Sequence, residues 1–471
     1  MVFSSEIFIF GFFALMLLCY YVLPRKFRNL SLLIFSLFFF YAWDKPSYAF
    51  VMVFSILFNF VSALIIDNRL KAEKRRGAKS VLVTAIVINI ALLAFFKYTN
   101  LFISNINSLF DTGIPILDIT LPIGISFYTF QTMSYTIDVY RRDCSVQKNI
   151  IDFAAYVTMF PQLIAGPIVR YKTIEPQLKN RRENISDFSY GIKRFTIGLA
   201  KKAILANGIF ALWNEVSAMQ SPPVMTAWLG AVAYTFQIYF DFSGYSDMAI
   251  GMGKMLGFTF LENFDLPYIS KSITEFWRRW HISLGTWFRE YVYIPLGGNR
   301  RGKARQIINL LIVWALTGFW HGASWNFLLW GLYFGVILIM EKLFLLKVLE
   351  KLPAFIGHIY SLLLILFGWV IFANEDFSVM SGYFSNLFYS ENGFCDSYSF
   401  YLLFSYIALL GISAVCSTTL PRKLGAAIGE KLKAVPLIYE ILTTLCIIIL
   451  LLVSVAFVAA GSYNPFLYFR F

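Results

Sequence analysis

The chain has 471 residues, of which 58% are hydrophobic and 19% aromatic, and its formal net charge is +13. Soluble domains average about 45–50% apolar residues, so this composition excludes an ordinary soluble enzyme. Of the 40 Lys and Arg residues, all but Lys45, Lys97 and Arg470 fall in seven segments between apolar stretches. This distribution is typical of the inner loops of a multi-pass membrane protein and argues against a nucleic-acid-binding face.

Apolar stretches of about 20 residues, the length of a spanning helix, recur along the chain. The first stretch, 5–23, has no positive charge before it and no small-residue cleavage site after it, so we expect a retained span rather than a secretory signal. Placing the basic segments inside predicts about twelve transmembrane helices with both termini outside. They are expected near 5–23, 29–43, 48–66, 80–98, 121–140, 190–217, 225–243, 306–320, 325–345, 354–373, 400–417 and 436–460.

Three apolar regions contain residues that interrupt helices. Segment 150–169 has two prolines and positive charge on both sides, which predicts a re-entrant segment. Leu121-Pro-Ile-Gly124 opens the next irregular stretch, and Asp241-Phe-Ser-Gly-Tyr-Ser-Asp247 is expected to end the span that begins at 225. Irregular backbone at membrane depth is tolerated only against protein or a water-filled cavity, so the three breaks together predict such a cavity. For any one of them alone, an ordinary kink is the alternative, because Pro and Gly are common in membrane helices.

Residues 272–291 predict an amphipathic helix that lies in the membrane interface. Ser272 and Glu275 match a capping box, and aromatic and aliphatic residues follow at helical spacing. His281 is expected on the buried face of this helix, together with Trp277 and Leu284.

A second histidine, His321, ends the apolar run 306–320 in a chain that has only three histidines. The small residues Ala315, Gly318 and Gly322 are spaced so that another helix can approach closely. A buried imidazole is held neutral by desolvation and can then act as a general base towards a hydroxyl. A structural role is the alternative for a histidine at a helix end; the second histidine, also beside tryptophan, strengthens the active-site interpretation without excluding the structural one.

Asp241 and Asp247 could orient a histidine or bind substrate hydroxyls; capping or solvating a helix end is the alternative. No metal site and no bound cofactor are predicted, because His358 lies in a separate span and no His or Cys pair has metal-ligand spacing. The five cysteines do not indicate a disulfide framework.

The chain resembles the membrane-bound O-acyltransferase (MBOAT) family, in the branch that contains the membrane subunit of alginate O-acetyltransferase and related polysaccharide or peptidoglycan acetylation proteins. The resemblance implies an all-α polytopic fold over 1–471, in which tilted, re-entrant and interfacial helices form a ring around a central funnel. It is carried by six motifs in order within 120–335: Leu121-Pro-Ile-Gly-Ile-Ser-Phe-Tyr-Thr-Phe-Gln131, Phe160-Pro-Gln-Leu-Ile-Ala-Gly-Pro167, Phe240-Asp-Phe-Ser-Gly-Tyr-Ser-Asp247, Phe276-Trp-Arg-Arg-Trp-His-Ile-Ser-Leu284, Tyr293-Ile-Pro-Leu-Gly-Gly298 and Gly318-Phe-Trp-His-Gly322.

The resemblance implies that His321 is the catalytic histidine and that His281 is the second polar position of the active site. The last six residues, 466–471, match a terminal aromatic pattern of this branch, which implies that Tyr468 carries the acyl group transiently. A phenol is a possible nucleophile. An aromatic anchor at the membrane interface is the alternative role for this tail.

The function implied by the resemblance is O-acetyl transfer in a bacterial cytoplasmic membrane. A cytoplasmic thioester, acetyl-CoA, would be the donor, and an extracellular polysaccharide would receive the acetyl group through a secreted partner. D-alanyl transfer to teichoic acid from a carrier-protein thioester is the first alternative; that system places the terminal motif on a separate peptide. A non-enzymatic transporter is the second, although the chain shows no repeated halves.

Overall fold

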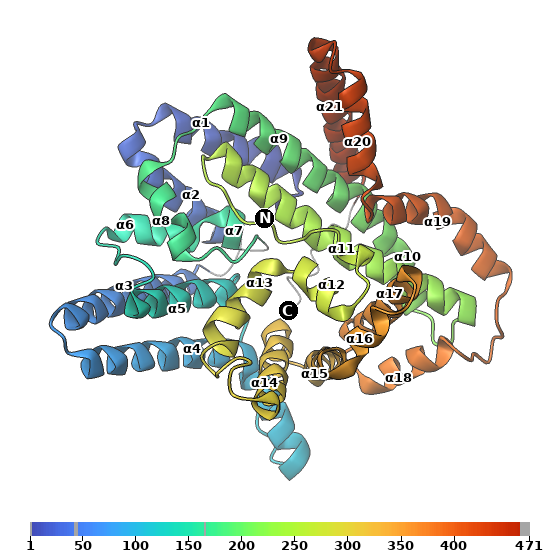
Figure 1. The fold of residues 1–471 in the computed structure, drawn as a ribbon, viewed down its shortest axis with the longest axis horizontal. Coiled ribbons are helices and arrows are strands. Elements are labelled where there is room, and N and C mark those ends of the chain that lie inside the picture. Colours follow the sequence, from blue (N-terminus) through green and yellow to red (C-terminus); the bar gives the residue numbers. More distant parts are fainter. Residues whose placement is uncertain (1, 42–45, 164–165, 462–471) are drawn as a thin grey trace. The chain divides into compact units, whose positions relative to one another are not determined.

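A computed structural model describes residues 2–41, 46–163 and 166–461 (Figure 1). The described residues form helices joined by turns and loops, and none of them is in a β-strand. The chain divides into two compact units. Unit 1 comprises Met1–Phe195 and Met248–Leu261, and unit 2 comprises Thr196–Asp247 and Glu262–Phe471. Two helices, α9 (Ile185–Ala200) and α11 (Val224–Met255), contribute residues to both units.

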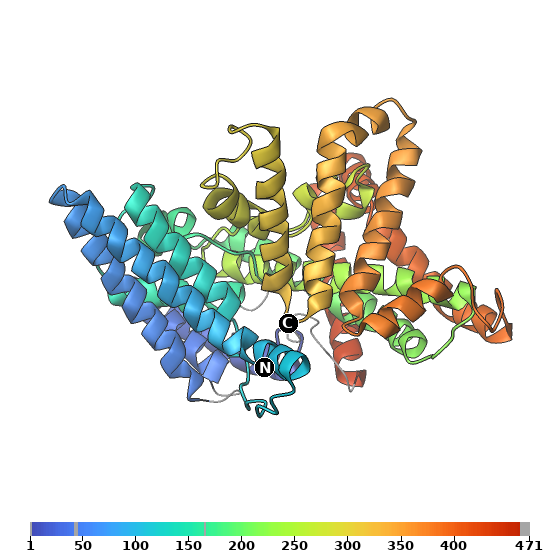
Figure 2. The same ribbon diagram turned by 90° about the horizontal axis from the view of Figure 1, so that it is seen from below.

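In unit 1, the long helices α3, α4 and α5 pack side by side (Figure 2). A pair of buried amides joins α3 to α4, because Asn59 and Asn89 each donate a side-chain hydrogen bond to the other, at 3.0 and 2.9 Å. A buried amide without a partner is costly, so this pair fixes how the two helices align. The elements of this unit before α9 are η1 (Ile7–Phe13), α1 (Ala14–Val22), η2 (Arg25–Phe27), α2 (Arg28–Tyr41), α3 (Tyr48–Lys71), α4 (Arg75–Phe110), α5 (Ile125–Arg141), α6 (Ile150–Thr158), α7 (Phe160–Leu163) and α8 (Tyr171–Asn180).

Two of the predicted interruptions lie in unit 1, and both are confirmed as breaks in the helices. The apolar segment 150–169 contains two short helices, α6 and α7, because Met159 leaves the helical conformation with ψ 104°. Gly124 precedes α5 with φ +75°, a left-handed conformation that glycine adopts without steric cost. The re-entrant path of 150–169 through a membrane stays a prediction.

In unit 2, α14 and α15 form a closely packed helical hairpin. Gly318 and Gly322 face α15, where an added Cβ atom would collide with the backbone or ring of Phe327, so the predicted close approach at these two positions is confirmed. The elements of this unit are η3 (Lys201–Ala206), α10 (Asn207–Ser217), η4 (Pro267–Ile269), α12 (Ile273–Arg279), α13 (Ile282–Phe288), η5 (Arg289–Tyr293), α14 (Lys303–His321), α15 (Trp325–Met340), η6 (Glu341–Leu345), α16 (Leu346–Leu349), α17 (Ala354–Ala373), α18 (Phe377–Asn386), α19 (Ser397–Cys416), α20 (Leu420–Lys431) and α21 (Pro436–Ala460), with most of α11.

The predicted end of a span at Asp241–Asp247 is wrong, because α11 continues without a break from Val224 to Met255. The glycine in this motif serves packing instead of a turn. A Cβ atom on Gly244 would lie 2.7 Å from the carbonyl oxygen of Gly198 on α9, so the glycine lets the two helices approach closely.

The single amphipathic helix predicted over 272–291 is also wrong. It is divided into α12, α13 and the π-helical turn η5, and His281 sits at the break with φ +45°. The loop segment 263–265, which precedes both helices in the chain, replaces the missing helical hydrogen bonds. Ile282 N donates to Asn263 O, and Asp265 N donates to Arg279 O, both at 3.0 Å. Backbone pairing with this segment therefore outweighs the local helical preference.

Among the residues that the structure describes, six helices are long and apolar enough to cross a membrane, and a shorter apolar helix covers Ile7–Val22. The other predicted spans fall on helices that are shorter or more polar, so the count of twelve stays a prediction, as does a ring around a funnel. The six are Tyr48–Lys71, Arg75–Phe110, Ile185–Ser217, Ala354–Ala373, Ser397–Cys416 and Pro436–Ala460. The chain is therefore a multi-pass helical membrane protein.

Candidate active site

The two predicted active-site histidines lie in unit 2 and contact the same indole. The Trp320 ring centroid is 6.0 Å from that of His281 and 5.0 Å from that of His321. Both imidazoles are buried, with 2% and 4% of their surface exposed. The tertiary structure thus brings together two side chains that are 40 positions apart in the sequence.

A hydrogen-bonding partner from a distant segment orients His281. Its Nδ1 lies 3.2 Å from the side-chain oxygen of Asn263, which also accepts hydrogen bonds from the backbone N (3.2 Å) and the hydroxyl (2.8 Å) of Ser283. An amide oxygen only accepts, so Nδ1 of His281 carries the proton and Nε2 keeps its lone pair. Burial lowers the pKa of this imidazole to about 3, so the ring is neutral at physiological pH.

His321 occupies the last position of α14, where aromatic rings surround it. Its ring centroid is 4.9 Å from that of Trp330 and 5.5 Å from that of Phe372, both nearly perpendicular. Trp314, seven residues earlier on α14, also contacts Trp330, so Trp314 and His321 lie on the same side of the helix. Aromatic side chains therefore form much of the surroundings of this buried imidazole at the end of a helix.

A cavity of about 710 Å³ opens beside His281. Three exposed cations line it together with apolar and aromatic side chains: Arg278, Arg289 and Lys342. A pocket with apolar walls and a few charged groups suits a ligand with an apolar or neutral end and an anionic end. Successive turns of α14 form one wall through Leu310, Val313, Trp314 and Thr317, so the helix that lines the cavity is also the helix that carries His321.

A buried carboxylate fixes the start of α12. Glu341, 1% exposed on η6, accepts hydrogen bonds at 2.7 Å from the backbone N of Ile273 and of Thr274, and at 3.1 Å from the hydroxyl of Tyr360. The first N–H groups of a helix have no intrahelical partner and favour a negative charge. Glu341 therefore anchors the helix that leads to His281.

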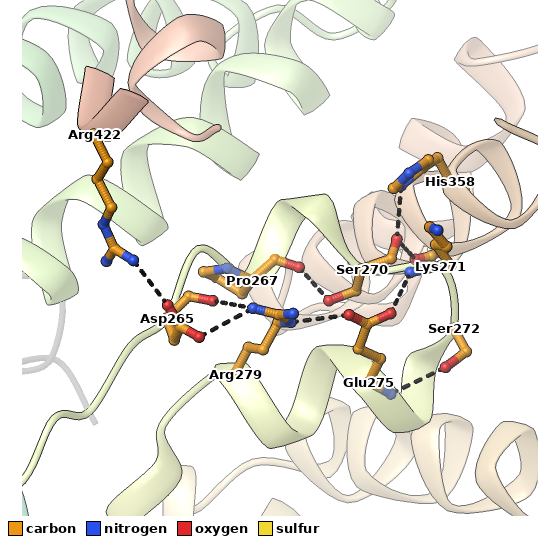
Figure 3. Close-up of polar contacts among 10 residues, drawn as sticks. Asp265, Pro267, Ser270, Lys271, Ser272, Glu275, Arg279, His358 and Arg422 are labelled. Atoms are coloured by element: carbon orange, nitrogen blue, oxygen red, sulfur yellow. Dashed lines mark hydrogen bonds and ion pairs between the residues drawn. The ribbon is translucent and has the colours of Figure 1, made fainter. Parts of the chain in front are cut away.

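Ion pairs hold the other end of the same helix (Figure 3). The Arg279 guanidinium lies between two carboxylates, 3.0 Å from Asp265 and 3.0 Å from Glu275. Arg422 on α20 reaches the other oxygen of Asp265 at 3.2 Å. These contacts fix the segment that pairs with the backbone at the His281 break.

The predicted capping box at Ser272 is half formed. The Ser272 hydroxyl accepts a hydrogen bond from the backbone N of Glu275, as expected, but the Glu275 carboxylate accepts from the backbone N of Lys271 instead of Ser272 (Figure 3).

The third histidine of the chain, His358, has Nδ1 3.2 Å from the backbone oxygen of Ser270. It therefore supports the loop before α12.

Asp241 and Asp247 form ion pairs with consecutive lysines at the start of the π-helix η3. Lys202 Nζ lies 2.5 Å from Asp241, where both side chains are 2% exposed, and Lys201 Nζ lies 2.7 Å from Asp247. Between the two acids, Phe242 contacts His281, with ring centroids 4.8 Å apart. The role of the two acids towards substrate stays a prediction.

Sequence reasoning missed Lys202, Asn263 and Glu341. A signal existed for Lys202, since an ionisable residue inside a predicted span is costly and requires a partner. The same signal existed for Glu341, which lies inside the predicted span 325–345. Asn263 does not stand out in the sequence, because its role depends on a pairing that only the folded chain forms. Tyr468 lies outside the described residues. Within the described part of the chain, no three His, Cys, Asp or Glu side chains are grouped as a metal site requires.

Comparison with known proteins identifies the family of the chain. Residues 35–374 match the profile of the MBOAT, membrane-bound O-acyltransferase family. The chain is 38% identical to the probable alginate O-acetylase AlgI of Azotobacter vinelandii over the whole of both chains. It is 37% identical to the peptidoglycan O-acetyltransferase of Helicobacter pylori over 73% of this chain and 70% of that protein, and 29% identical to the teichoic acid D-alanyltransferase of Streptococcus thermophilus over 48% and 58%. The chain therefore belongs to the membrane-bound O-acyltransferase family and is an acyltransferase.

Proposed function

We propose that this enzyme moves an acetyl group from acetyl-CoA in the cytoplasm, across a bacterial cytoplasmic membrane, towards an extracellular polysaccharide. The single observation that supports this most strongly is the meeting of two buried histidines at Trp320, with a cavity beside His281. The relatives named for O-acetylation of alginate and of peptidoglycan, which are more similar than the D-alanyl relative, support acetyl as the group transferred.

The donor would occupy the cavity beside His281. The phosphates of CoA are anionic and fit Arg278, Arg289 and Lys342, while the apolar walls suit the neutral thioester arm. With Nδ1 protonated, His281 accepts a hydrogen bond from an N–H or O–H at Nε2 and cannot donate one to a carbonyl oxygen. His281 is therefore assigned to positioning the donor instead of polarising the thioester carbonyl.

His321 is assigned the role of general base. It takes the proton of the acceptor hydroxyl as the hydroxyl oxygen attacks the thioester carbonyl carbon. The new C–O bond forms, the C–S bond breaks, and the thiolate of CoA leaves with the proton that His321 received. A ring of helices around a funnel would let the inner donor and the outer acceptor meet at this point.

The Tyr468 phenol is proposed as the first acceptor. Its aryl ester would be a reactive donor for the next transfer. A secreted partner would then pass the acetyl group to the polysaccharide. Replacing Tyr468 with Phe keeps the ring and removes the nucleophile, so a variant that acetylates the polymer at the normal rate would rule out this relay.

The test of the proposed function uses membranes that contain the full chain. We expect label from acetyl-CoA, and not from a D-alanyl carrier protein, to reach the acceptor. His321→Ala should abolish this transfer while the protein stays folded in the membrane, whereas the matched control His358→Ala should keep it. Transfer of D-alanine would contradict the acetyl assignment, full activity of His321→Ala would contradict the assigned base, and transport without acyl turnover would identify a transporter.

A further inference from the structure

A second cavity, of about 540 Å³, lies in unit 1 between α3 and α4, and it shares no lining residue with the cavity beside His281. Both helices are long and apolar enough to cross a membrane, and Figure 2 shows them side by side. We call this cavity the α3–α4 groove; the residues that line it are Phe54, Leu57, Phe58, Val61, Ser62, Ile65, Arg69, Ser80, Val81 and Thr84.

The α3–α4 groove is lined mainly by apolar side chains that point away from the protein interior. On α3 its residues recur every three or four positions, which places them on one face of the helix. Phe54, Leu57 and Val61 are each 49% exposed, whereas Asn59 and Asn89 pair on the buried side of the same two helices. In a membrane, this exposed face contacts lipid, so the groove is open to an acyl chain.

The groove ends at a cluster of positive charge. Arg69 is the cationic residue among the described residues that line it. The turn from α3 to α4 adds further exposed basic residues, Lys74, Arg75, Arg76 and Lys79, whereas Lys71 is paired with Asp67. Among the residues that the structure describes, no carboxylate forms an ion pair with Arg69. The Arg69 side chain lies over Gly77, where a Cβ atom would meet its guanidinium. An arginine held at the end of an apolar groove is suited to a phosphate group.

The length of the groove matches one leaflet of a bilayer. From Phe54 to Arg69 the α-helix rises about 22 Å at 1.5 Å per residue. Half of a bilayer, from its midplane through the headgroups, is about 20–22 Å thick. An acyl chain lying along the groove would therefore place its headgroup phosphate at Arg69.

We propose that the α3–α4 groove is a binding site for one anionic glycerophospholipid, with an acyl chain between the two helices and the phosphate on Arg69. Basic residues beside membrane helices on the inner side attract anionic lipid headgroups. The apolar face alone would accept any lipid, so selectivity for an anionic headgroup comes from Arg69. This inference does not depend on the reaction proposed above.

The charge is tested with the full-length protein, purified in a neutral detergent, by native mass spectrometry with added phosphatidylglycerol or phosphatidylcholine. We expect preferential retention of phosphatidylglycerol. Arg69→Gln should weaken it by about fivefold, the factor for about 1 kcal/mol per basic residue at an anionic lipid surface. The matched control Arg76→Gln removes a charge from the same turn outside the groove and should keep the preference.

The shape is tested by filling the groove. Val61→Trp places an indole in it and should abolish lipid retention, whereas Val53→Trp, at a 40% exposed position of α3 outside the groove, should not. Equal losses in Arg69→Gln and Arg76→Gln, or full retention in Val61→Trp, would overturn the proposal. Displacement of the lipid by inorganic phosphate alone would assign Arg69 to free phosphate. If the wild-type protein forms dimers and Val61→Trp dissociates them, the groove binds a second copy of the chain instead of a lipid.

Discussion

At the residue scale, the chemistry of His281 depends on its neighbours more than on its own sequence position. Its left-handed backbone, with φ +45°, costs about 1–3 kcal/mol and persists because surrounding contacts enforce it. Asn263 supplies two of these contacts, a backbone oxygen to Ile282 N and a side-chain oxygen near Nδ1. The residue that determines the tautomer of His281 also stabilises its strained backbone.

Asn263→Ala removes the group that orients the imidazole. We expect a loss of about a hundredfold in kcat/KM, because a misplacement of about 1 Å at a reacting group has an effect of that size. Asn309→Ala, which deletes another buried amide of unit 2, is the matched control and should change kcat/KM much less. Acyl transfer by purified membranes measures the effect, and equal losses in the two variants would contradict the positioning role.

The pKa of His281 predicts how stability depends on pH. This pKa falls from its ordinary value of 6.5 to about 3 on folding, so below pH 6.5 the unfolded chain binds a proton that the folded chain does not. The free energy of unfolding therefore decreases as the pH drops from 6.5 towards 3. His281 alone lowers it by about 2 kcal/mol at pH 5.

His281→Asn, which cannot be protonated, should remove that acid sensitivity. The measurement is the melting temperature of the detergent-solubilised protein at pH 7.5 and at pH 5. We expect the difference between the two values to be smaller in His281→Asn than in the wild type or in the control His358→Asn. An unchanged difference would contradict the neutral state of the buried ring.

At the element scale, the buried ion pair of Lys202 and Asp241 ties η3 to α11, the helix that also presents Phe242 to His281. Removal of one member of a buried pair leaves an uncompensated charge and costs about 3–5 kcal/mol, whereas replacing both with apolar residues is often neutral. The pair therefore offers a way to separate a structural role of Asp241 from a role towards substrate.

We expect Lys202→Met alone to lower the melting temperature strongly and the double variant Lys202→Met with Asp241→Leu to recover most of it. Acyl transfer by the double variant is the second measurement. A stable and active double variant would assign Asp241 to structure alone, and a stable but inactive one would support the predicted contact with substrate. If the double variant is no more stable than Lys202→Met, the pair does not join these helices.

At the scale of the whole molecule, the distribution of positive charge predicts which loops face the cytoplasm. Two native cysteines can test this predicted orientation, because Cys395 is exposed in a predicted outer loop and Cys144 lies in a predicted inner loop. A membrane-impermeant maleimide should label Cys395 in intact spheroplasts and Cys144 only after permeabilisation. Peptide mass spectrometry measures the labelling, with Cys395→Ser as the control. Labelling of Cys144 in intact spheroplasts would reverse the predicted orientation.

The sequence alone was sufficient to identify a multi-pass membrane acyltransferase and to single out His281 and His321. Hydropathy, charge and the motifs around the histidines are local properties, so they can be recognised before any folding is considered. The break in 150–169 was predictable for the same reason, since a proline disturbs its own helix. The meeting of the two histidines at Trp320 was not available from any of these patterns.

Only the tertiary structure decided the break before His281, the tautomer of its ring and the continuity of α11 through Asp241 and Asp247. Asn263, from a loop outside both helices, supplies the contacts for the first two. In α11, Gly244 lies inside the helix and gives α9 room to approach at Gly198. Local patterns predict what a segment prefers by itself, whereas buried polar groups and crossing helices take the conformation that satisfies their distant partners.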